Sequence, residues 1–512
     1  MSKRVRTLLL CGVAVAVLAV SLVAVLLIPP PDDGGTTQTT TTEADAKVDV
    51  WRKTGNDADG KSITVKSVSV KNGDEGYTLI TNDDGNMVLE QYPDLPHDNG
   101  SLVTLKNQLM TIEAIRLIDK APTEPQKYGF DGTALTVSAT YTDGTSFAFE
   151  IGNKNPDESG RYLRATESGE VYLYDAGEAE TFYLSGIQYV RKSPLTLPET
   201  KEEESAASDT VVVRDVELGG TIRPSNIYFQ VSSEPIVEGG VEASSTGYFI
   251  KRPYFRGVKM NSPLLDSVAF TNLYVKSVEA VYPTAAQLKE YGLDTPYSQA
   301  TVTLAARHDN VTKNENDKTV TTYSYYNALE YTIRIGNEAG DGLRYAVVYQ
   351  ENKLFPVVYR VQAKNVAWCD VQYDDVADTL LFYTYILKVQ DVSVTVDGIT
   401  TKFDLKHVTD DESTTTVVKS NGKTIDADKF REIYQAMMSL QRLAATTDKP
   451  SGDPVFALKI TTNTDTVPNT DVKLYPYSGS KYLAAHSSGE TYLIDAKAVE
   501  PFLKQYREFI GG

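Results

Sequence analysis

The stretch RYLRATESGEVYLYDA (residues 161–176) recurs near the end of the chain as KYLAAHSSGETYLIDA (residues 481–496). Ten of the sixteen positions match, and the match needs no gap. Similarity of this length between distant parts of one chain is typical of a duplicated structural unit. We therefore expect at least two copies of one fold in this protein.

A weaker copy lies between these two. It is recognised by short motifs that the first and middle copies share: Tyr128-Gly-Phe-Asp with Tyr291-Gly-Leu-Asp, Ile151-Gly-Asn with Ile335-Gly-Asn, and an Arg-Tyr pair that follows each Ile-Gly-Asn at Arg161 and Arg344. The 512 residues exceed what one hydrophobic core usually organises. The spacing predicts three repeat units, at residues 48–200, 201–370 and 371–512, of which the third is divergent.

Each unit begins with residues that alternate between apolar and polar, as in Ser67-Val-Ser-Val and Val392-Ser-Val-Thr-Val. This period of two is typical of strands with one buried face. Asn-Gly or Asp-Gly pairs follow such runs and favour tight hairpins, at Asn72, Asp84, Asp143, Asp397 and Asn421. Short hairpins favour antiparallel sheets, because parallel strands need a long crossover. The predicted fold class is α+β, with repeated, mainly antiparallel β units.

One helix is expected to cover the sheet in each unit. In the third unit Phe430, Ile433, Tyr434, Met437 and Leu440 recur at helical spacing behind the possible cap Asp426. The first unit has Leu102, Leu105, Leu109 and Ile112 at similar spacing, and the second has a possible start at Ser262-Pro263, followed by Leu265 and Val268. We interpret these stripes as core positions, because a sheet with one apolar face needs a cover.

The first 28 residues predict a membrane anchor. Residues 7–28 carry no charge and would span about 33 Å as a helix, enough for a hydrocarbon layer of about 30 Å. Basic residues precede this segment and none follow it closely, so residues 1–6 are expected in the cytoplasm and the remainder outside the cell. A cleaved signal peptide has a shorter apolar region. Residues 29–47, rich in Pro, Gly and Thr, form the expected flexible linker.

The bulk composition excludes several classes of protein. The net charge is −19, and Lys3, Arg4 and Arg6 lie before the anchor, so the exported part is more acidic still. No basic cluster is visible that could meet a nucleic acid, and no nucleic-acid partner is expected. Cys11 lies in the anchor and Cys369 is alone beyond it, so no internal disulfide is expected there.

The short motifs also indicate a family. Gln91-Tyr-Pro-Asp-Leu-Pro, the helical pattern after it, Tyr-Gly-Phe/Leu-Asp, Ile-Gly-Asn and Arg-Tyr resemble domain-of-unknown-function family 4340. The resemblance is strongest in the first unit and weak at the start of the third, which lacks Tyr-Gly-Leu and Ile-Gly-Asn. It implies a single-pass membrane protein with an accessory role beside ABC transporter permease or auxiliary subunits of the gliding-motility type. It supplies no catalytic residues.

Candidate chemistry is sparse. His97, His308, His407 and His486 do not stand at helical ligand spacing, so we interpret each as a surface or turn residue. Gly55-Asn-Asp-Ala-Asp-Gly-Lys-Ser matches the phosphate-loop pattern, but a strand-like pattern follows it where that loop needs a helix. As a calcium loop it would have Gly55 and Lys66 where carboxylates are required. A solvent-exposed turn is the better interpretation.

Two further features have structural interpretations. Ala-Trp-Cys369-Asp reads as a buried strand end, without a motif for an activated thiolate. Unit two is rich in tyrosines, which suit half-buried strand positions but could also stack on sugars: Tyr323, Tyr325, Tyr326, Tyr331, Tyr345, Tyr349 and Tyr359.

The sequence therefore predicts no catalytic, cofactor-binding or metal-binding residues and no enzyme activity. The expected function is that of a membrane-anchored extracytoplasmic accessory or scaffold protein, associated with an ABC transporter. A module that binds cell-wall polysaccharide is the alternative. An extracytoplasmic hydrolase is a remote one, since no nucleophile with a positioned base can be named.

Overall fold

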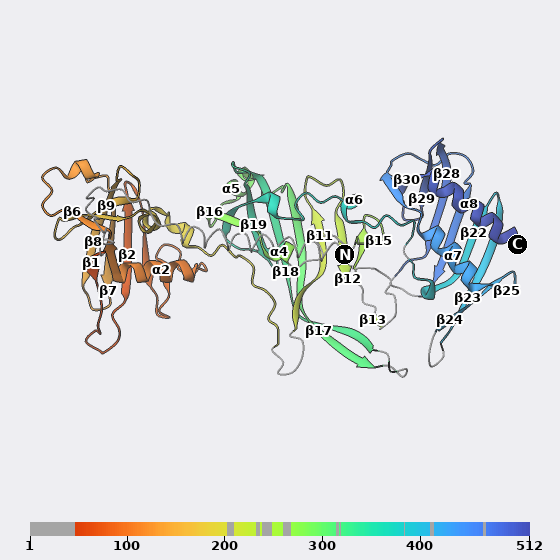
Figure 1. Cartoon of the computed structure of the whole chain (residues 1–512), viewed down its shortest axis with the longest axis horizontal. Coiled ribbons are helices and arrows are strands. Elements are labelled where there is room, and N and C mark those ends of the chain that lie inside the picture. The colour runs from red at the N-terminus through yellow and green to blue at the C-terminus, as the bar shows by residue number, and fades with distance from the viewer. Residues whose placement is uncertain are drawn as a thin grey trace, which may run out of the picture.

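The computed structural model describes residues 47–201, 209–231, 236–237, 248–259, 268–313, 317, 319–382, 384–409, 414–463 and 467–511. Within these residues the chain forms three antiparallel sheets of eight, eleven and nine strands, which lie in a row (Figure 1). A two-stranded sheet of β1 (Val48–Arg52) and β5 (Thr111–Ala114) lies beside the first of them. The prediction of mainly antiparallel sheets with a few helices is confirmed.

The strands of the first sheet are β2 (Val65–Asn72), β3 (Glu75–Thr81), β4 (Met87–Leu89), β6 (Arg116–Asp119), β7 (Leu135–Tyr141), β8 (Ser146–Lys154), β9 (Gly160–Ala165) and β10 (Val171–Asp175). The repeated stretch at residues 161–176 therefore forms the β9–β10 hairpin. The alternation of residues along β7 is reflected in strictly alternating burial, with Leu135, Val137, Ala139 and Tyr141 inside.

The strands of the second sheet are β11 (Thr210–Gly219), β12 (Ile227–Val231), β13 (Ile236–Val237), β14 (Tyr248–Arg252), β15 (Arg256–Gly257), β16 (Val275–Val281), β17 (Ser298–Lys313), β18 (Thr319–Glu338), β19 (Arg344–Gln350), β20 (Lys353–Leu354) and β21 (Val357–Val361). The long pair β17 and β18 extends well beyond its neighbours (Figure 1).

The strands of the third sheet are β22 (Val389–Val396), β23 (Ile399–Thr409), β24 (Thr414–Ser420), β25 (Lys423–Ile425), β26 (Arg442–Ala445), β27 (Phe456–Thr462), β28 (Thr470–Ser478), β29 (Lys481–His486) and β30 (Thr491–Asp495). The second copy of the repeated stretch forms the β29–β30 hairpin, as the first copy forms β9–β10.

All three sheets have the same strand order. The first strand (β2, β11 or β22) lies inside the sheet, and hairpins lead from it to one edge at β4, β15 or β25. The chain then crosses to the opposite edge at β6, β16 or β26. The last four strands start beside the first strand and end beside that opposite edge. We call the edge at β4, β15 or β25 the hairpin edge and the edge at β6, β16 or β26 the return edge.

The helices are α2 (Asn99–Met110), α3 (Ala176–Glu180), α4 (Val268–Thr271), α5 (Ala285–Glu290), α6 (Tyr373–Val376), α7 (Ala427–Met438) and α8 (Ala496–Gly511). Asp426 caps α7 through the amides of Asp428 and Lys429, and α7 buries Phe430, Ile433, Tyr434 and Met437. Burial of each such side chain stabilises the fold by roughly 1.5–3 kcal/mol. The predicted cap and four of the five stripe residues are confirmed; Leu440, the fifth, is buried but lies beyond the end of α7.

Two helix predictions need correction. Ile112 does not extend the stripe of α2, because α2 ends at Met110 and Ile112 lies in β5, where it is fully buried. Each unit has more than one helix where one was expected: α3 follows α2 in the first, α5 follows α4 in the second, and α6 and α8 accompany α7 in the third. The largest addition is α8, whose apolar stripe packs beside α7 and is made of Val499, Phe502, Leu503 and Tyr506. In the second unit the predicted helix start at Ser262 and Leu265 lies outside the described residues, and α4 has one turn.

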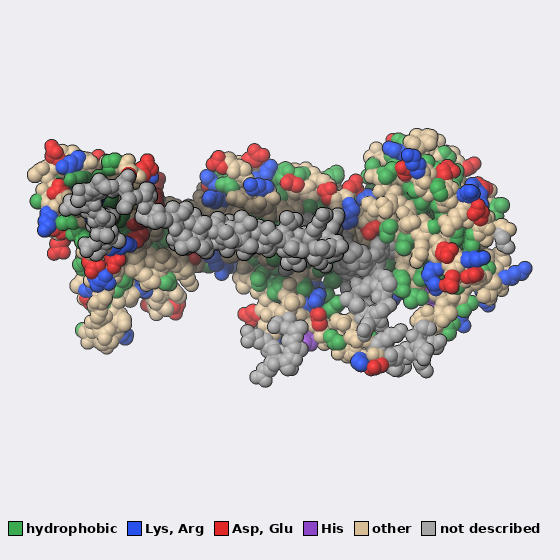
Figure 2. All heavy atoms as spheres, in the orientation of Figure 1, with side chains coloured by type: hydrophobic (Ala, Val, Ile, Leu, Met, Phe, Trp, Pro, Cys, Tyr) green, Lys and Arg blue, Asp and Glu red, His purple; other side chains and the backbone are tan. Residues whose placement is uncertain are grey.

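The predicted membrane anchor at residues 7–28, the cytoplasmic tail at 1–6 and, apart from Lys47, the linker at 29–47 also lie outside the described residues. In the part of the chain that the structure describes, no helix has the length and apolarity needed to cross a membrane. On the face drawn in Figure 2, Lys and Arg side chains lie among Asp and Glu side chains along the whole row.

Neighbouring sheets meet edge to edge, and the hairpin edge of one always faces the return edge of the next. At the first joint, a short 3₁₀ helix, η3 (Gly186–Tyr189), packs beside β3, β4 and β16. The Gln188 side chain donates to the Val278 carbonyl on β16 (2.7 Å) and accepts from the Val278 amide (3.1 Å). At the second joint, β15 of the second sheet meets the β26 and β30 side of the third.

Candidate functional site

The family motifs pack against one another in the first two units. Gly152 lies so close to the Tyr128 carbonyl that a Cβ on it would be 2.2 Å from that oxygen, and Gly336 has the same relation to Tyr291. The Asn337 amide donates to the Tyr291 carbonyl (2.8 Å). The Tyr-Gly and Ile-Gly-Asn motifs therefore hold the loop before β7 or β17 against the end of β8 or β18.

The arginine of each Arg-Tyr pair completes this arrangement. Arg161 donates to the Gly152 carbonyl (3.3 Å), and Arg344 donates to the Gly336 carbonyl (3.0 Å). The Arg344 guanidinium also lies 3.8 Å from the centre of the Tyr297 ring. These contacts give the motif residues a packing role.

A buried charge cluster joins the second and third sheets. Glu490, which is 2% exposed, lies between two guanidinium groups. Arg256 donates to Glu490 Oε2 from Nε (3.1 Å) and Nη2 (2.9 Å), and Arg442 donates to Oε1 (3.0 Å). Arg442 also donates to Asp374 Oδ1 (2.8 Å). Because charges this deeply buried must be paired, the cluster fixes how the two sheets meet.

The backbone of residues 377–380 runs through the same joint. Ala377 forms an isolated antiparallel bridge with Val258, directly after β15, and Leu380 forms one with Gln441, directly before β26. Arg256 also donates to the Leu380 carbonyl. This segment therefore connects the hairpin edge of the second sheet to the return edge of the third by backbone pairing as well as by charge.

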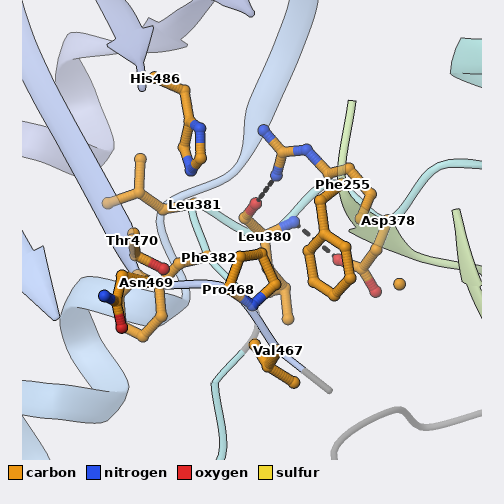
Figure 3. A pocket seen from close by; sticks show the side chains of 12 residues that line it. Phe255, Asp378, Leu380, Leu381, Phe382, Val467, Pro468, Asn469, Thr470 and His486 are labelled. Atoms are coloured by element: carbon orange, nitrogen blue, oxygen red, sulfur yellow. Dashed lines mark hydrogen bonds between the residues drawn. The ribbon is translucent and has the colours of Figure 1, made fainter. Parts of the chain in front are cut away.

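A small cavity of about 20 Å³ lies beside this cluster. Figure 3 shows Phe255 and Asp378 on one side of it and Asn469, Thr470 and His486 on the other. Burial, together with the Arg256 charge, lowers the pKa of His486 to about 4, so its imidazole is neutral at pH 7. A cavity of this size holds about one water molecule and is too small for a substrate.

A larger cavity of about 480 Å³ lies on the first sheet, beside η3. Its lining combines aromatic rings with carboxylates and amides: Val70, Asn72, Asp74, Glu75, Gly76, Tyr77, Leu89, Gln91, Tyr92 and residues 182–187. Gln91 and Tyr92 belong to the Gln91-Tyr-Pro-Asp-Leu-Pro motif. A concave site with aromatic walls and a few polar groups is the usual composition of a small-ligand site. This cavity has room for a small ligand.

Several tyrosines of the second unit hold the connection between the first two units. The hydroxyl groups of Tyr331 and Tyr359 donate to the carbonyls of Thr196 and Arg191, the latter at 3.0 Å. The Tyr326 hydroxyl accepts from the Lys201 amide (3.0 Å). These contacts favour the structural interpretation of these tyrosines.

The four histidines lie in different surroundings. His97 accepts from the Leu89 amide (3.0 Å) and is buried, which lowers its pKa, so its interpretation as a surface or turn residue was wrong. His407 lies half-buried on β23, and its Nε2 is 2.9 Å from the Val389 carbonyl oxygen. His308 pairs with Asp209 (2.8 Å). No group of three or more His, Cys, Asp or Glu residues in the described ranges could hold a metal ion.

Cys369 is fully buried, but it lies in a turn and not at a strand end. Burial raises the pKa of its thiol to about 11, which opposes formation of a reactive thiolate. Arg223 holds this turn by donating to the carbonyls of Trp368 (2.6 Å) and Cys369 (3.1 Å).

The string Gly55–Ser62 forms a turn, as expected. Asn56 and Ser62 pair in an isolated bridge, and the Asp57 carboxylate accepts from the amides of Asp59 (3.0 Å) and Lys61 (2.9 Å). A strand, β2, follows it where a phosphate loop would need a helix. The amides of Asp57, Asp59, Gly60 and Lys61 already donate within the turn and are not free for a phosphate.

Comparison with known proteins agrees with the motifs. A family model described as "Domain of unknown function (DUF4340)" matches residues 88–214 and 266–453, which is more than half of the chain. The match to two separate regions supports the internal repeat. No curated protein and no solved structure matches. The chain therefore belongs to the family defined by the domain of unknown function DUF4340.

Proposed function

We propose that this protein is a membrane-anchored extracytoplasmic scaffold, an accessory protein of an ABC transporter. Residues 7–28 would cross the membrane, with residues 1–6 in the cytoplasm and the three sheets outside the cell. The observation that carries the proposal is the row of three like sheets whose joints are formed by side-chain contacts, half-buried at Gln188 and fully buried at Glu490.

The joints support this proposal because they fix the spacing between the exposed faces of the three sheets. Arrays of repeated units expose extended faces on which partner proteins dock. A flexible connection between units would leave those faces unaligned, whereas Gln188 at the first joint and Glu490 at the second hold each sheet against the next. The protein therefore suits a role in which it positions other proteins.

The transporter as partner is supported by the family resemblance. The test is affinity capture of the tagged full chain from membranes in mild detergent, followed by identification of what copurifies. We expect permease or auxiliary subunits of an ABC transporter to be enriched. A chain in which an unrelated membrane helix replaces residues 7–28 should capture the same subunits, because the proposal assigns the contact to the exported sheets.

Capture of no transporter subunit above the level of an unrelated single-pass protein would contradict the proposal. Capture that is lost in the helix-replaced chain would assign the contact to the anchor and contradict the scaffold role of the sheets.

The cavity of about 480 Å³ favours a second candidate function, the binding of cell-wall polymer. Sugars stack on aromatic rings, and their hydroxyls donate hydrogen bonds to carboxylates and exchange them with amides. The cavity is lined by Tyr77, Tyr92, Asp74 and Gln91. The full chain in nanodiscs should then sediment with purified cell wall, and Asp74→Asn with Gln91→Ala should reduce the bound fraction. The exposed Gln126 lies outside the cavity, so Gln126→Ala is the control. Wild-type chain that stays in the supernatant would exclude this candidate.

A further inference from the structure

Within the described residues, the row of three large sheets has two ends that face no other large sheet. The return edge of the first sheet, at β6, and the hairpin edge of the third sheet, at β25, lie at opposite ends of the molecule (Figure 1). Inside the row, each return edge faces the hairpin edge of the sheet before it. One free edge is therefore a return edge and the other a hairpin edge, the two kinds of edge that meet at each joint inside the row.

The second joint defines what each kind of edge contributes. The third sheet offers an acceptor surface made of Glu490, Arg442 and the backbone of residues 377–380. Glu490 directly precedes β30, and Arg442 is the first residue of β26. The second sheet offers Arg256, the first residue of β15 after the hairpin turn.

The first sheet repeats this acceptor surface. Glu170 directly precedes β10, at the same place in the repeated stretch as Glu490, and Arg116 is the first residue of β6. Glu170 is only partly buried, and it accepts from the Tyr172 hydroxyl (2.6 Å). No guanidinium lies against it among the described residues, in contrast to Glu490.

The backbone part of the acceptor surface is repeated as well. The Lys53 amide donates to Met110, the last residue of α2 (2.8 Å), as the Leu381 amide donates to Met438, the last residue of α7 (3.3 Å). By this equivalence β1 stands where residues 377–380 stand in the third unit. In the described part of the chain β1 pairs with β5 alone, so its other edge is open.

The third sheet repeats the donor. Lys423 is the first residue of β25 after the Asn421-Gly422 turn, as Arg256 is the first residue of β15. Lys423 is exposed and forms no ion pair with another described residue. A basic side chain is therefore presented at the free hairpin edge, and a carboxylate is presented at the free return edge.

We infer that this protein associates head to tail with further copies of itself, the hairpin edge at β25 of one copy docking on β1 and β6 of the next, with Lys423 facing Glu170. The contact reuses the edge pairing and the charge pairing of the second joint. It is heterologous, so both edges remain available at the ends of any assembly and the row can extend. The inference does not depend on the proposed membrane placement or transporter partner.

The test is sedimentation velocity of the full chain in detergent at low ionic strength. Wild type should form species that grow with concentration beyond a dimer. Glu170→Lys and Lys423→Glu should each weaken association by roughly tenfold or more, because like charges then face each other in the contact. The controls Glu167→Lys, in the same turn as Glu170, and Lys473→Glu, exposed on β28, carry the same charge changes and should associate like wild type.

Mixing the two charge variants gives the sharpest outcome. The intact Lys423 edge of the Glu170→Lys chain faces the intact Glu170 edge of the Lys423→Glu chain, and the two altered edges also carry opposite charges. An equimolar mixture should therefore associate beyond a dimer, although neither variant does so alone. A chain that carries both Glu170→Lys and Lys423→Glu should regain association, which a folding defect would not permit. Wild type that remains monomeric at all concentrations, or a mixture that associates no more than the separate variants do, would overturn the inference.

Discussion

At the scale of single residues, the two glutamates of the repeated stretch have different surroundings. Glu170 and Glu490 occupy the same position in the duplicated sequence, yet Glu170 accepts from a neighbouring tyrosine while Glu490 is enclosed by Arg256 and Arg442. Local sequence sets the turn in which each glutamate lies, but the residue that reaches it comes from another sheet. The sequence shows a glutamate in the Ser-Gly-Glu turn of both copies, which could have marked this position as a candidate contact. It does not show which of the two glutamates is enclosed by arginines of another sheet.

Replacing Glu490 should open the second joint. Glu490→Gln leaves the buried Arg256 without a counter-charge and Arg442 with Asp374 alone. Removing one partner of a buried pair costs about 3–5 kcal/mol. If this free energy is lost from local opening of the joint, the opening equilibrium rises by roughly a hundredfold or more. Hydrogen–deuterium exchange at residues 377–381 should accelerate by the same factor. Glu170→Gln, the matched control, should leave exchange there unchanged. Equal exchange in both variants would mean that the cluster does not hold the joint.

His486 makes the stability of this joint depend on pH. Burial and Arg256 lower the pKa of His486 to about 4 from its ordinary 6.5, so the unfolded chain binds the proton first as the pH falls. Stability from the neutral imidazole is therefore present above pH 6.5 and is lost between about pH 6.5 and 4. From pH 7 to pH 5 the melting temperature of wild type should fall more than that of His486→Gln. An identical fall in both proteins would refute this role.

At the scale of elements, local patterns predicted the turns and α7 because their causes are local. Gly73, Gly85, Gly144, Gly398 and Gly422 all adopt the positive φ that their Asn-Gly or Asp-Gly pairs favour. The placement of Ile112 was wrong because its apolar side chain suits α2 and β5 equally, and pairing with β1 decides between them. The apolar residues of α8 recur at helical spacing, so this helix could have been predicted from the sequence. The edge-to-edge order of the sheets could not, because it depends on contacts between residues far apart in the sequence.

The motif glycines can be tested at this scale. Gly336→Ala places a Cβ about 2.2 Å from the Tyr291 carbonyl, so the loop must move away from the end of β18. We expect a loss of stability of about 1–3 kcal/mol, as for other overpacked sites. The control is Gly479→Ala, because nothing lies within 4 Å of a Cβ built there. Calorimetry should show a lower melting temperature for the first variant only, and equal values would remove the packing role of the motif.

At the scale of the whole molecule, one strand order used three times produces a row with complementary ends. The contacts that define the row join residues far apart in sequence, such as Arg256 and Glu490, which periodicity and motif spacing cannot relate. The cavity beside η3 has the same origin, since residues 70–77, 89–92 and 182–187 meet at the hairpin edge of the first sheet. The sequence predicted the sheets and the repeat, and it predicted no site at this edge.

The central claim is that this row is displayed outside the membrane that residues 7–28 are proposed to cross. The most direct test uses a full chain with Cys11 and Cys369 replaced by Ala and a single cysteine introduced by Lys473→Cys, at an exposed position on β28. Ser2→Cys in the same background is the control for the cytoplasmic side. In intact spheroplasts a membrane-impermeant maleimide should label the Lys473→Cys chain, and it should label the Ser2→Cys chain only after lysis. Labelling of Lys473→Cys only after lysis would contradict the account.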